Sequence, residues 1–344
     1  MCPKWNSIRK SIFYTCLIAA LLPIALQARI TKVGTTTVQF LKIGVGARGM
    51  GMGGATVASV NDASALYWNP AVIANTNTRR VLVTYTDWFL DTDIAYTGLV
   101  LPLGDFGSLG FTFNSLSMGE MDVRTVDHPE GTGERFSASD LAVGVAFAKR
   151  LTNFFSVGFH GKYIRQSIWH CNASSIAFDF GSIYRTDNDR LLLGVSISNF
   201  GNKMQYTGKD LRIFYDQNPS EHGDNEYLPA FYETGKWDLP LIFRIGLAVN
   251  LPEFPVGDLV AEVDAIHPND NSEEVNLGLE WNLNRLLFLR TGYQSLFQQN
   301  AEQGPTFGAG LQYKMYSSTL IVNYGYADMG RFTAVQRFDL EIVF

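Results

Sequence analysis

Alternation of apolar and polar residues dominates this chain, recurring in about fourteen short stretches. In the last stretch, Phe338, Leu340 and Ile342 alternate with Asp339 and Glu341. A period of two predicts β-strands whose two faces meet different surroundings. No helical pattern is available to cover the apolar faces, so a lipid bilayer suits them best. A sheet crosses lipid only when it closes on itself, because unpaired edge N–H and C=O groups find no water there. The sequence therefore predicts an all-β fold, a closed antiparallel transmembrane β-barrel of about 14 strands.

The expected strands and their connections fit one orientation in the membrane. The strands are expected at 81–90, 93–102, 107–118, 137–150, 153–168, 172–186, 190–199, 237–250, 257–267, 273–283, 286–295, 304–315, 317–326 and 333–344. Short connections alternate with mostly longer ones, of which the longest are 119–136 and 200–236. Outer-membrane barrels place short turns on the periplasmic side and long loops outside. Both ends of the barrel region, 80–344, are therefore expected on the periplasmic side, with the terminal aromatic Phe344 as a barrel signal. The alternative is a soluble β-sandwich or β-solenoid, because a sandwich also buries one face of each strand.

The amino terminus has the pattern of an export signal. Lys4, Arg9 and Lys10 precede the apolar run 11–26, and a small residue follows at Ala28. This order predicts a secretory signal peptide over 1–28. Together with the expected barrel, export predicts a location in the bacterial outer membrane. Removing three of the 27 basic residues leaves 24 against 33 acidic residues, a net charge of −9. Such a balance argues against nucleic acid as a partner.

A glycine-rich region lies between the signal and the first expected strand. The residues from Gly44 to Gly49 match the GxGxxG dinucleotide fingerprint and follow the strand-like stretch 38–43. We reject that interpretation and expect no cofactor, because no βαβ series follows and the next residues are a poor helix start. The glycines instead suit close backbone packing inside a crowded barrel. Residues 63–74 are expected to form a short helix that Pro70 breaks at Asn69.

Two stretches of this region resemble the opening of the PorV/PorQ family, outer-membrane barrels associated with type IX secretion and related in form to the FadL transporters. Residues 40–55 read FLKIGVGARGMGMGGA and residues 61–71 read NDASALYWNPA. The similarity continues through 136–144, 155–159, 162–165 and 199–241. It implies that residues 29–79 plug the barrel lumen, as the corresponding segment does in FadL-like relatives. The plug motif would comprise Gly44, Gly46, Arg48, Gly49, Gly51, Gly53, Gly54, Asn69, Pro70 and Ala71.

Charged residues collect on the inward faces of the expected strands. They are Lys162, Asp179, Arg244, Glu262, Asp264, Glu280, Arg290, Lys314, Arg337, Asp339 and Glu341. A selectivity lining normally favours one sign of charge, whereas these signs are nearly balanced. A lattice of ion pairs that seats the plug is therefore the preferred interpretation, with Arg48 as a partner for inward carboxylates.

Catalytic and metal-binding patterns are weak. Ser156 and His160 share one strand face, but a barrel supplies such pairs by chance and no acidic partner follows from spacing. His128, His170, His222 and His267, together with Cys171, are scattered over the expected loops without ligand spacing. We expect neither an enzyme nor a metal site.

Aromatic residues distinguish the long loop 200–236. Tyr206, Phe214, Tyr215, Phe231 and Tyr232 are its expected recognition residues, although the loop could instead only cover the barrel mouth. The family resemblance implies that such loops bind secreted client proteins, through their carboxyl-terminal signal domains, and pass them to attachment components. FadL-like uptake of hydrophobic small molecules such as fatty acids or hydrocarbons is the alternative, and a purely structural barrel in the outer-membrane lipid is a third.

Overall fold

A closed β-barrel accounts for most of the residues in this computed structural model, which describes residues 32–220, 227–251, 256–298 and 301–344. The expected signal segment 1–28 lies outside the described residues. Residues 33–344 form one compact unit. Within the described part of the chain, no helix is both long and apolar enough to cross a membrane.

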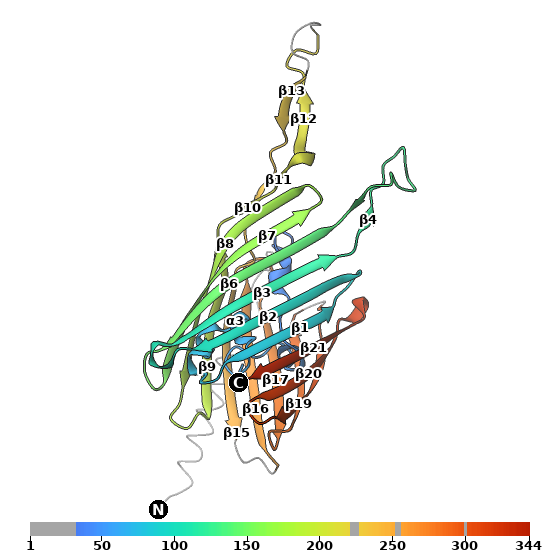
Figure 1. The fold of residues 1–344 in the computed structure, drawn as a ribbon. Helices are drawn as coiled ribbons and strands as arrows, with labels where there is room; N and C mark the ends of the chain where they lie inside the picture. The colour runs from blue at the N-terminus through green and yellow to red at the C-terminus, as the bar shows by residue number, and fades with distance from the viewer. Residues whose placement is uncertain (1–31, 221–226, 252–255, 299–300) are drawn as a thin grey trace, which may run out of the picture. The chain divides into compact units, whose positions relative to one another are not determined.

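The barrel wall consists of long antiparallel strands (Figure 1). They are β1 (Arg80–Asp87), β2 (Thr92–Pro102), β3 (Ser108–Met118), β6 (Ala138–Arg150), β7 (Phe155–Ile168), β8 (Cys171–Arg185), β9 (Leu191–Gly201), β15 (Ile242–Leu251), β16 (Asp258–Pro268), β17 (Glu274–Leu283), β18 (Leu287–Leu296), β19 (Pro305–Lys314), β20 (Thr319–Asp328) and β21 (Ala334–Val343). Each pairs with its neighbours along the chain, β1 also pairs with β21, and β9 pairs with both β8 and β15. The ring is therefore closed, and the predicted antiparallel barrel of about 14 strands is confirmed.

The two faces of the wall differ as the alternation predicts. In β15, Phe243, Ile245 and Leu247 are 37 to 41% exposed, whereas Arg244 and Ala248 are buried. Exposed aliphatic and aromatic side chains recur at alternate positions on the other long strands. The outer face of the barrel is thus apolar and the inner face carries the polar groups, as a strand wall in lipid requires.

The two ends of the barrel differ in the length of their connecting loops. The long-loop end holds residues 119–137 and 202–241, and the short-turn end holds turns such as 103–107 and 151–154, where η4 (Gly104–Phe106) lies in the first. The loops at the long-loop end also contain η6 (Gly330–Phe332) and a small ladder of β4 (Met121–Asp122) with β5 (Arg135–Phe136).

The loop expected over 200–236 contains several short strands in its described part. It contains β10 (Met204–Gln205), β11 (Thr207–Gly208), η5 (Lys209–Leu211), β12 (Arg212–Tyr215), β13 (Leu228–Phe231) and β14 (Lys236–Trp237). β11 pairs antiparallel with the first two residues of β8, β10 pairs with β14, and β12 pairs with β13. The barrel strand expected from residue 237 begins only at Ile242, because Trp237 pairs within this loop instead.

The amino-terminal segment, defined as residues 33–79, contacts inner faces on several sides of the ring. It contains η2 (Gln39–Lys42), α2 (Ala47–Gly51), α3 (Ala65–Trp68) and η3 (Pro70–Asn75). α2 packs against β18 to β21, whereas η3 packs against β6, β7 and β8. The helical break expected at Asn69 is confirmed. The strand-like stretch 38–43 forms a 3₁₀ turn instead, because a closed barrel offers it no strand edge.

Candidate functional site

A buried ion network joins the amino-terminal segment to the barrel wall. Arg48 Nε donates to Glu280 Oε2 at 2.9 Å and its Nη2 donates to Oε1 at 3.1 Å. Arg290 Nε donates to the same Oε2 at 2.5 Å, and its Nη1 reaches Asn323. The side chains of Arg48, Glu280 and Arg290 are all at most 4% exposed. One carboxylate from β17 therefore holds a guanidinium from the segment and another from β18.

Other inward carboxylates bind backbone N–H groups rather than cations. Asp264 accepts from the backbone of Thr56 and Val57, at 2.8 and 3.0 Å. Glu262 accepts from the next two residues of the segment, at 2.6 and 3.0 Å. Asp339 accepts from Ala47 N at the start of α2, whose N-cap Gly46 provides no capping side chain. The wall thus supplies caps that the segment lacks, a role that sequence reasoning missed.

Two further predicted inward charges, Glu341 and Lys314, lie in different surroundings. Glu341 is buried, accepts from Ala63 N at 3.2 Å and lies 3.4 Å from Nη1 of Arg80. Lys314 is the last residue of β19 and is exposed at the short-turn end. The structure therefore does not bring Lys314 to the buried charges.

Asp179 is the centre of a second buried cluster. It lies opposite His160 in the β7–β8 ladder, and their Oδ2 and Nδ1 atoms are 3.0 Å apart. Lys162 Nζ lies 2.8 Å from Oδ1, and Asn199 N donates to the same oxygen at 2.7 Å. Spacing along the chain could not indicate this acidic partner, because the register of two different strands creates the contact.

The pair suggested by Ser156 and His160 does not form. Ser156 Oγ donates to Asn75 Oδ1 at 3.4 Å, and His160 Nε2 contacts Thr112 Oγ1 at 3.0 Å. Among the residues that the structure describes, no three His, Cys, Asp or Glu side chains are grouped so as to hold a metal ion.

The glycines of the segment lie at close backbone contacts. A Cβ on Gly53, where φ is +65°, would lie 2.7 Å from the backbone nitrogen of Tyr293. Gly51 and Gly308 of β19 face each other in the same manner, since a Cβ on Gly51 would lie 2.9 Å from the partner Cα. A side chain at either position would push the segment away from the wall.

Trp68 and Asn69 fix the other half of the motif. Gly44 and Gly49 lie against the Trp68 ring, and its Nε1 donates to Val45 O at 3.0 Å. The Asn69 amide donates to backbone oxygens of the segment and of β8, both at 3.0 Å, and accepts from Ala71 N. Pro70 then starts η3 directly after the break.

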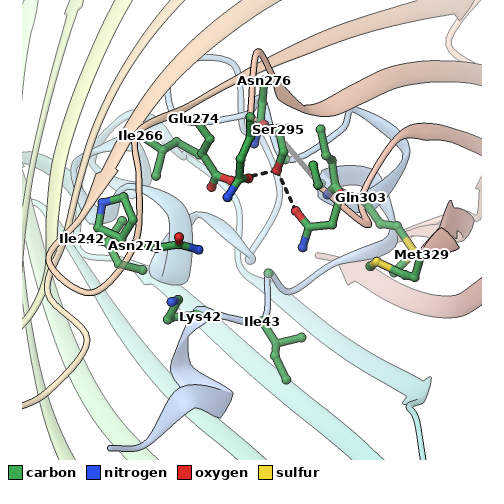
Figure 2. A pocket seen from close by; sticks show the side chains of 18 of the residues that line it. Lys42, Ile43, Ile242, Ile266, Asn271, Glu274, Asn276, Ser295, Gln303 and Met329 are labelled. Atoms are coloured by element: carbon green, nitrogen blue, oxygen red, sulfur yellow. Dashed lines mark hydrogen bonds between the residues drawn. The ribbon is translucent and has the colours of Figure 1, made fainter. Parts of the chain in front are cut away.

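A cavity of about 400 Å³ opens between the segment and strands β15 to β18 and β21 (Figure 2). Ser295 Oγ bonds to Glu274 Oε2 at 2.8 Å and to Gln303 Oε1 at 2.9 Å on one wall. Lys42 and Ile43 of the segment form another part of the lining. Of the 23 lining residues, 11 are polar or charged and 9 are apolar, so the cavity has a mixed lining and differs from a purely apolar channel.

Near this cavity, the beginning of the segment is bound to loops at the long-loop end. The Asp270 carboxylate accepts from Thr36 Oγ1 at 2.5 Å and from Gln39 Nε2 and Lys42 Nζ, both at 2.9 Å. Burial raises the pKa of Asp270, but these hydrogen bonds and the charge of Lys42 outweigh it and hold the pKa below its ordinary value. Thr36 also forms a parallel bridge with Asp238. We call this contact the Asp270 latch.

The predicted loop aromatics divide into an exposed group and a single half-buried residue. Phe214, Tyr215, Phe231 and Tyr232 are 54 to 65% exposed on or beside the β12–β13 hairpin, which extends past the ends of the barrel strands (Figure 1). Tyr206 packs against a buried cluster that includes Val38 and Met204. The base of this loop is thus anchored on the amino-terminal segment, and its aromatic tip is exposed.

Taken together, the closed strand wall, its apolar outer face and its charged interior define an outer-membrane β-barrel. Solved structures share this fold. The toluene transporter TbuX of Ralstonia pickettii has 12% sequence identity and a TM-score of 0.54, and the match covers 87% of this chain and 97% of that one. The toluene transporter TodX of Pseudomonas putida has 14% sequence identity and a TM-score of 0.54, and the match covers 87% of this chain and 96% of that one. A FadL homologue of Pseudomonas aeruginosa has 13% sequence identity and a TM-score of 0.51, and the match covers 87% of this chain and 98% of that one.

The family model for the type IX secretion system protein PorV matches residues 26–220. The chain therefore belongs to the PorV family, within a FadL-like fold. No curated protein matches it in sequence.

Proposed function

We propose that the long-loop end of this PorV-family barrel binds secreted client proteins, with the β12–β13 hairpin as the main contact. The main support is the group of exposed aromatic side chains on that hairpin, of which Phe214 is 64% and Phe231 is 65% exposed. Large aromatic side chains surrounded by polar groups are typical of the energetic centres of protein interfaces. The ladder at 121–136 lies at the same end and would extend the surface.

Client capture through carboxyl-terminal signal domains, and transfer to attachment components, are the finer parts of the proposal. Both are inferred from the resemblance to PorV-family proteins. The excess of acidic residues in the chain suits clients with basic patches, an effect expected mainly in the association rate.

Removal of the hairpin tests the proposal. Replacing residues 212–231 by a short Gly-Ser turn keeps β10, β11 and β14, so the barrel and the loop base should fold as before. We expect loss of co-purification with exported proteins. Phe106→Ser, an exposed aromatic at the short-turn end, is the matched control and should retain them. Retention of clients without the hairpin would exclude it as the contact.

FadL-like uptake makes a different prediction for the same variant. It would lose uptake of a labelled fatty acid or hydrocarbon while keeping its protein partners. If both activities survive, the hairpin only covers the barrel mouth.

We further propose that residues 29–79 act as a luminal plug. The support is the set of buried hydrogen bonds from Arg48 and from backbone N–H groups of the segment to inward carboxylates. Deleting 34–76 should raise single-channel conductance in planar bilayers. Unchanged, low conductance would mean that another part of the chain closes the lumen.

Residues 1–28 are proposed as a signal peptide that is cleaved after Ala28. Amino-terminal sequencing of protein taken from outer membranes should begin at Arg29. Retention of the apolar run 11–26 would contradict this.

A further inference from the structure

Two buried guanidinium groups line the cavity described above and form no salt bridge with any residue that the structure describes. Arg244 of β15 and Arg337 of β21 both line this cavity, and each is 3% exposed. Among the described residues, no carboxylate oxygen lies within 4.0 Å of either group. By contrast, the buried Arg48 and Arg290 share Glu280.

The surroundings of Arg244 orient its charge without neutralising it. Its Cζ lies 5.5 Å from the ring centroid of Tyr67 and 5.7 Å from that of Trp68. Nη1 donates to Ser198 Oγ at 3.0 Å, whereas Nε is buried with no hydrogen-bond partner. Cation–π contacts hold the plane of the group, but they replace only part of the hydration that burial removes.

Arg337 reaches the same cavity from another side of the barrel. β15 and β21 are six steps apart in the strand order of the ring. Arg337 Nε donates to Thr86 Oγ1 at 2.7 Å and Nη1 approaches Gly46 O at 3.5 Å, so both partners are neutral. Asp339, two positions along the same inward face of β21, interacts electrostatically with Arg337 but forms no salt bridge with it, and this carboxylate also accepts from Ala47 N. A buried cation that is neutralised only in part is costly, and an anion in the cavity would stabilise it.

The remaining charges of the cavity are already paired or bonded. Lys42 pairs with Asp270 in the latch, and Glu302 pairs with Arg331 at 3.3 Å. Glu274 accepts from Ser295. The hydroxyl of Ser295 is neutral, so Glu274 keeps its negative charge; the two arginines outnumber it, and the unpaired charge of the lining is net positive.

The polar part of the remaining lining favours a polar ligand. Five side-chain amides line the cavity, those of Asn271, Asn276, Gln294, Gln298 and Gln303. Asn276, Gln298 and Gln303 each make a hydrogen bond within the protein, but an amide has further donors and acceptors that a peptide-like group can bond and an alkyl chain cannot. We propose that this cavity is a binding site for a polar ligand bearing a carboxylate, which pairs with Arg244 and Arg337. This inference goes beyond the client surface and does not depend on it.

Calorimetric titration of the full-length mature protein in detergent tests the site. The probes are acetyl-triglycine with a free carboxylate, its carboxamide, and decanoate. The free acid should bind at least about tenfold more tightly than the amide, because a charge-assisted bond to a guanidinium is lost in the amide. Trp68 and Trp88 line the cavity, so binding should also change tryptophan fluorescence.

Arg244→Met should weaken binding of the free acid by about tenfold or more. Its melting temperature without ligand should stay equal or rise, because the substitution removes a buried charge that has no partner. Arg150→Met, at the exposed end of β6 and away from both the cavity and the hairpin, is the matched control and should bind as the unmodified protein does.

Four results would overturn the proposal. They are absence of binding by the free acid, equal affinity for acid and amide, full affinity in Arg244→Met, and tighter binding of decanoate than of the peptide acid. The acid–amide comparison uses the unmodified protein, so it holds even if the variant fails to fold.

Discussion

Replacing Glu280 by Gln should destabilise the barrel strongly, because this carboxylate is shared by two buried arginines. It accepts two hydrogen bonds from Arg48 and one from Arg290. The substitution keeps the shape but leaves both guanidinium groups uncompensated. Breaking a buried pair in this way costs about 3–5 kcal/mol in the free energy of unfolding.

Arg48→Met should cost less, about 1.5–3 kcal/mol, because Glu280 keeps its contact with Arg290. In the double variant the lost interaction is counted once, so the two effects should fall short of additivity by at least about 1 kcal/mol. Equilibrium urea unfolding in lipid vesicles, followed by tryptophan fluorescence, measures all three variants.

The matched control is Arg135→Gln, which removes an exposed pair with Glu120 and Asp122. It should change stability by no more than about 1 kcal/mol. Strict additivity of the two buried substitutions, or a loss below about 1 kcal/mol for Glu280→Gln, would refute the view that this network binds the segment to the wall.

Three further predictions concern the latch, the close contacts and the lipid face. Asp270→Asn should lower the free energy of unfolding at neutral pH; since the folded pKa lies below the unfolded value of about 3.9, the difference should be full above that pH and vanish as the pH falls through the folded value. A difference that is constant with pH would contradict this. Gly53→Ala should lower the free energy of unfolding in urea by at least about 1–3 kcal/mol, because the new side chain would have a positive φ and a clash with backbone atoms. Gly119→Ala, where a Cβ would meet no atom within 4 Å, should leave the stability unchanged. Leu247→Lys in the middle of β15 should lower the free energy of unfolding from vesicles by about 2–4 kcal/mol, whereas Leu251→Lys at the strand end should lower it by about 0–1 kcal/mol. Equal losses would mean that the outer face does not meet the bilayer.

Strand positions and the faces of the wall were predictable from the sequence. β3 was expected at 107–118 and occupies Ser108–Met118, and β17 was expected at 273–283 and occupies Glu274–Leu283. Period-two alternation is a local property that lipid on one side and polar contents on the other enforce in every strand. The break at Asn69 was also predictable, because Pro70 restricts the backbone directly before it.

The partners of the inward charges were decided only by the tertiary structure. Arg48 and Glu280 are 232 residues apart, and Asp339 meets the start of α2 because β21 pairs with β1 to close the ring. Sequence could count the inward charges but not tell which would meet a cation, a backbone N–H group or the cavity. The β12–β13 hairpin within 200–236 was not predicted either, because each of its strands has only four residues, too few for a reliable alternation pattern. Alternation fixes which face a side chain occupies, whereas its partner depends on strand register and on the path of the segment within the ring, and these are set by long-range contacts.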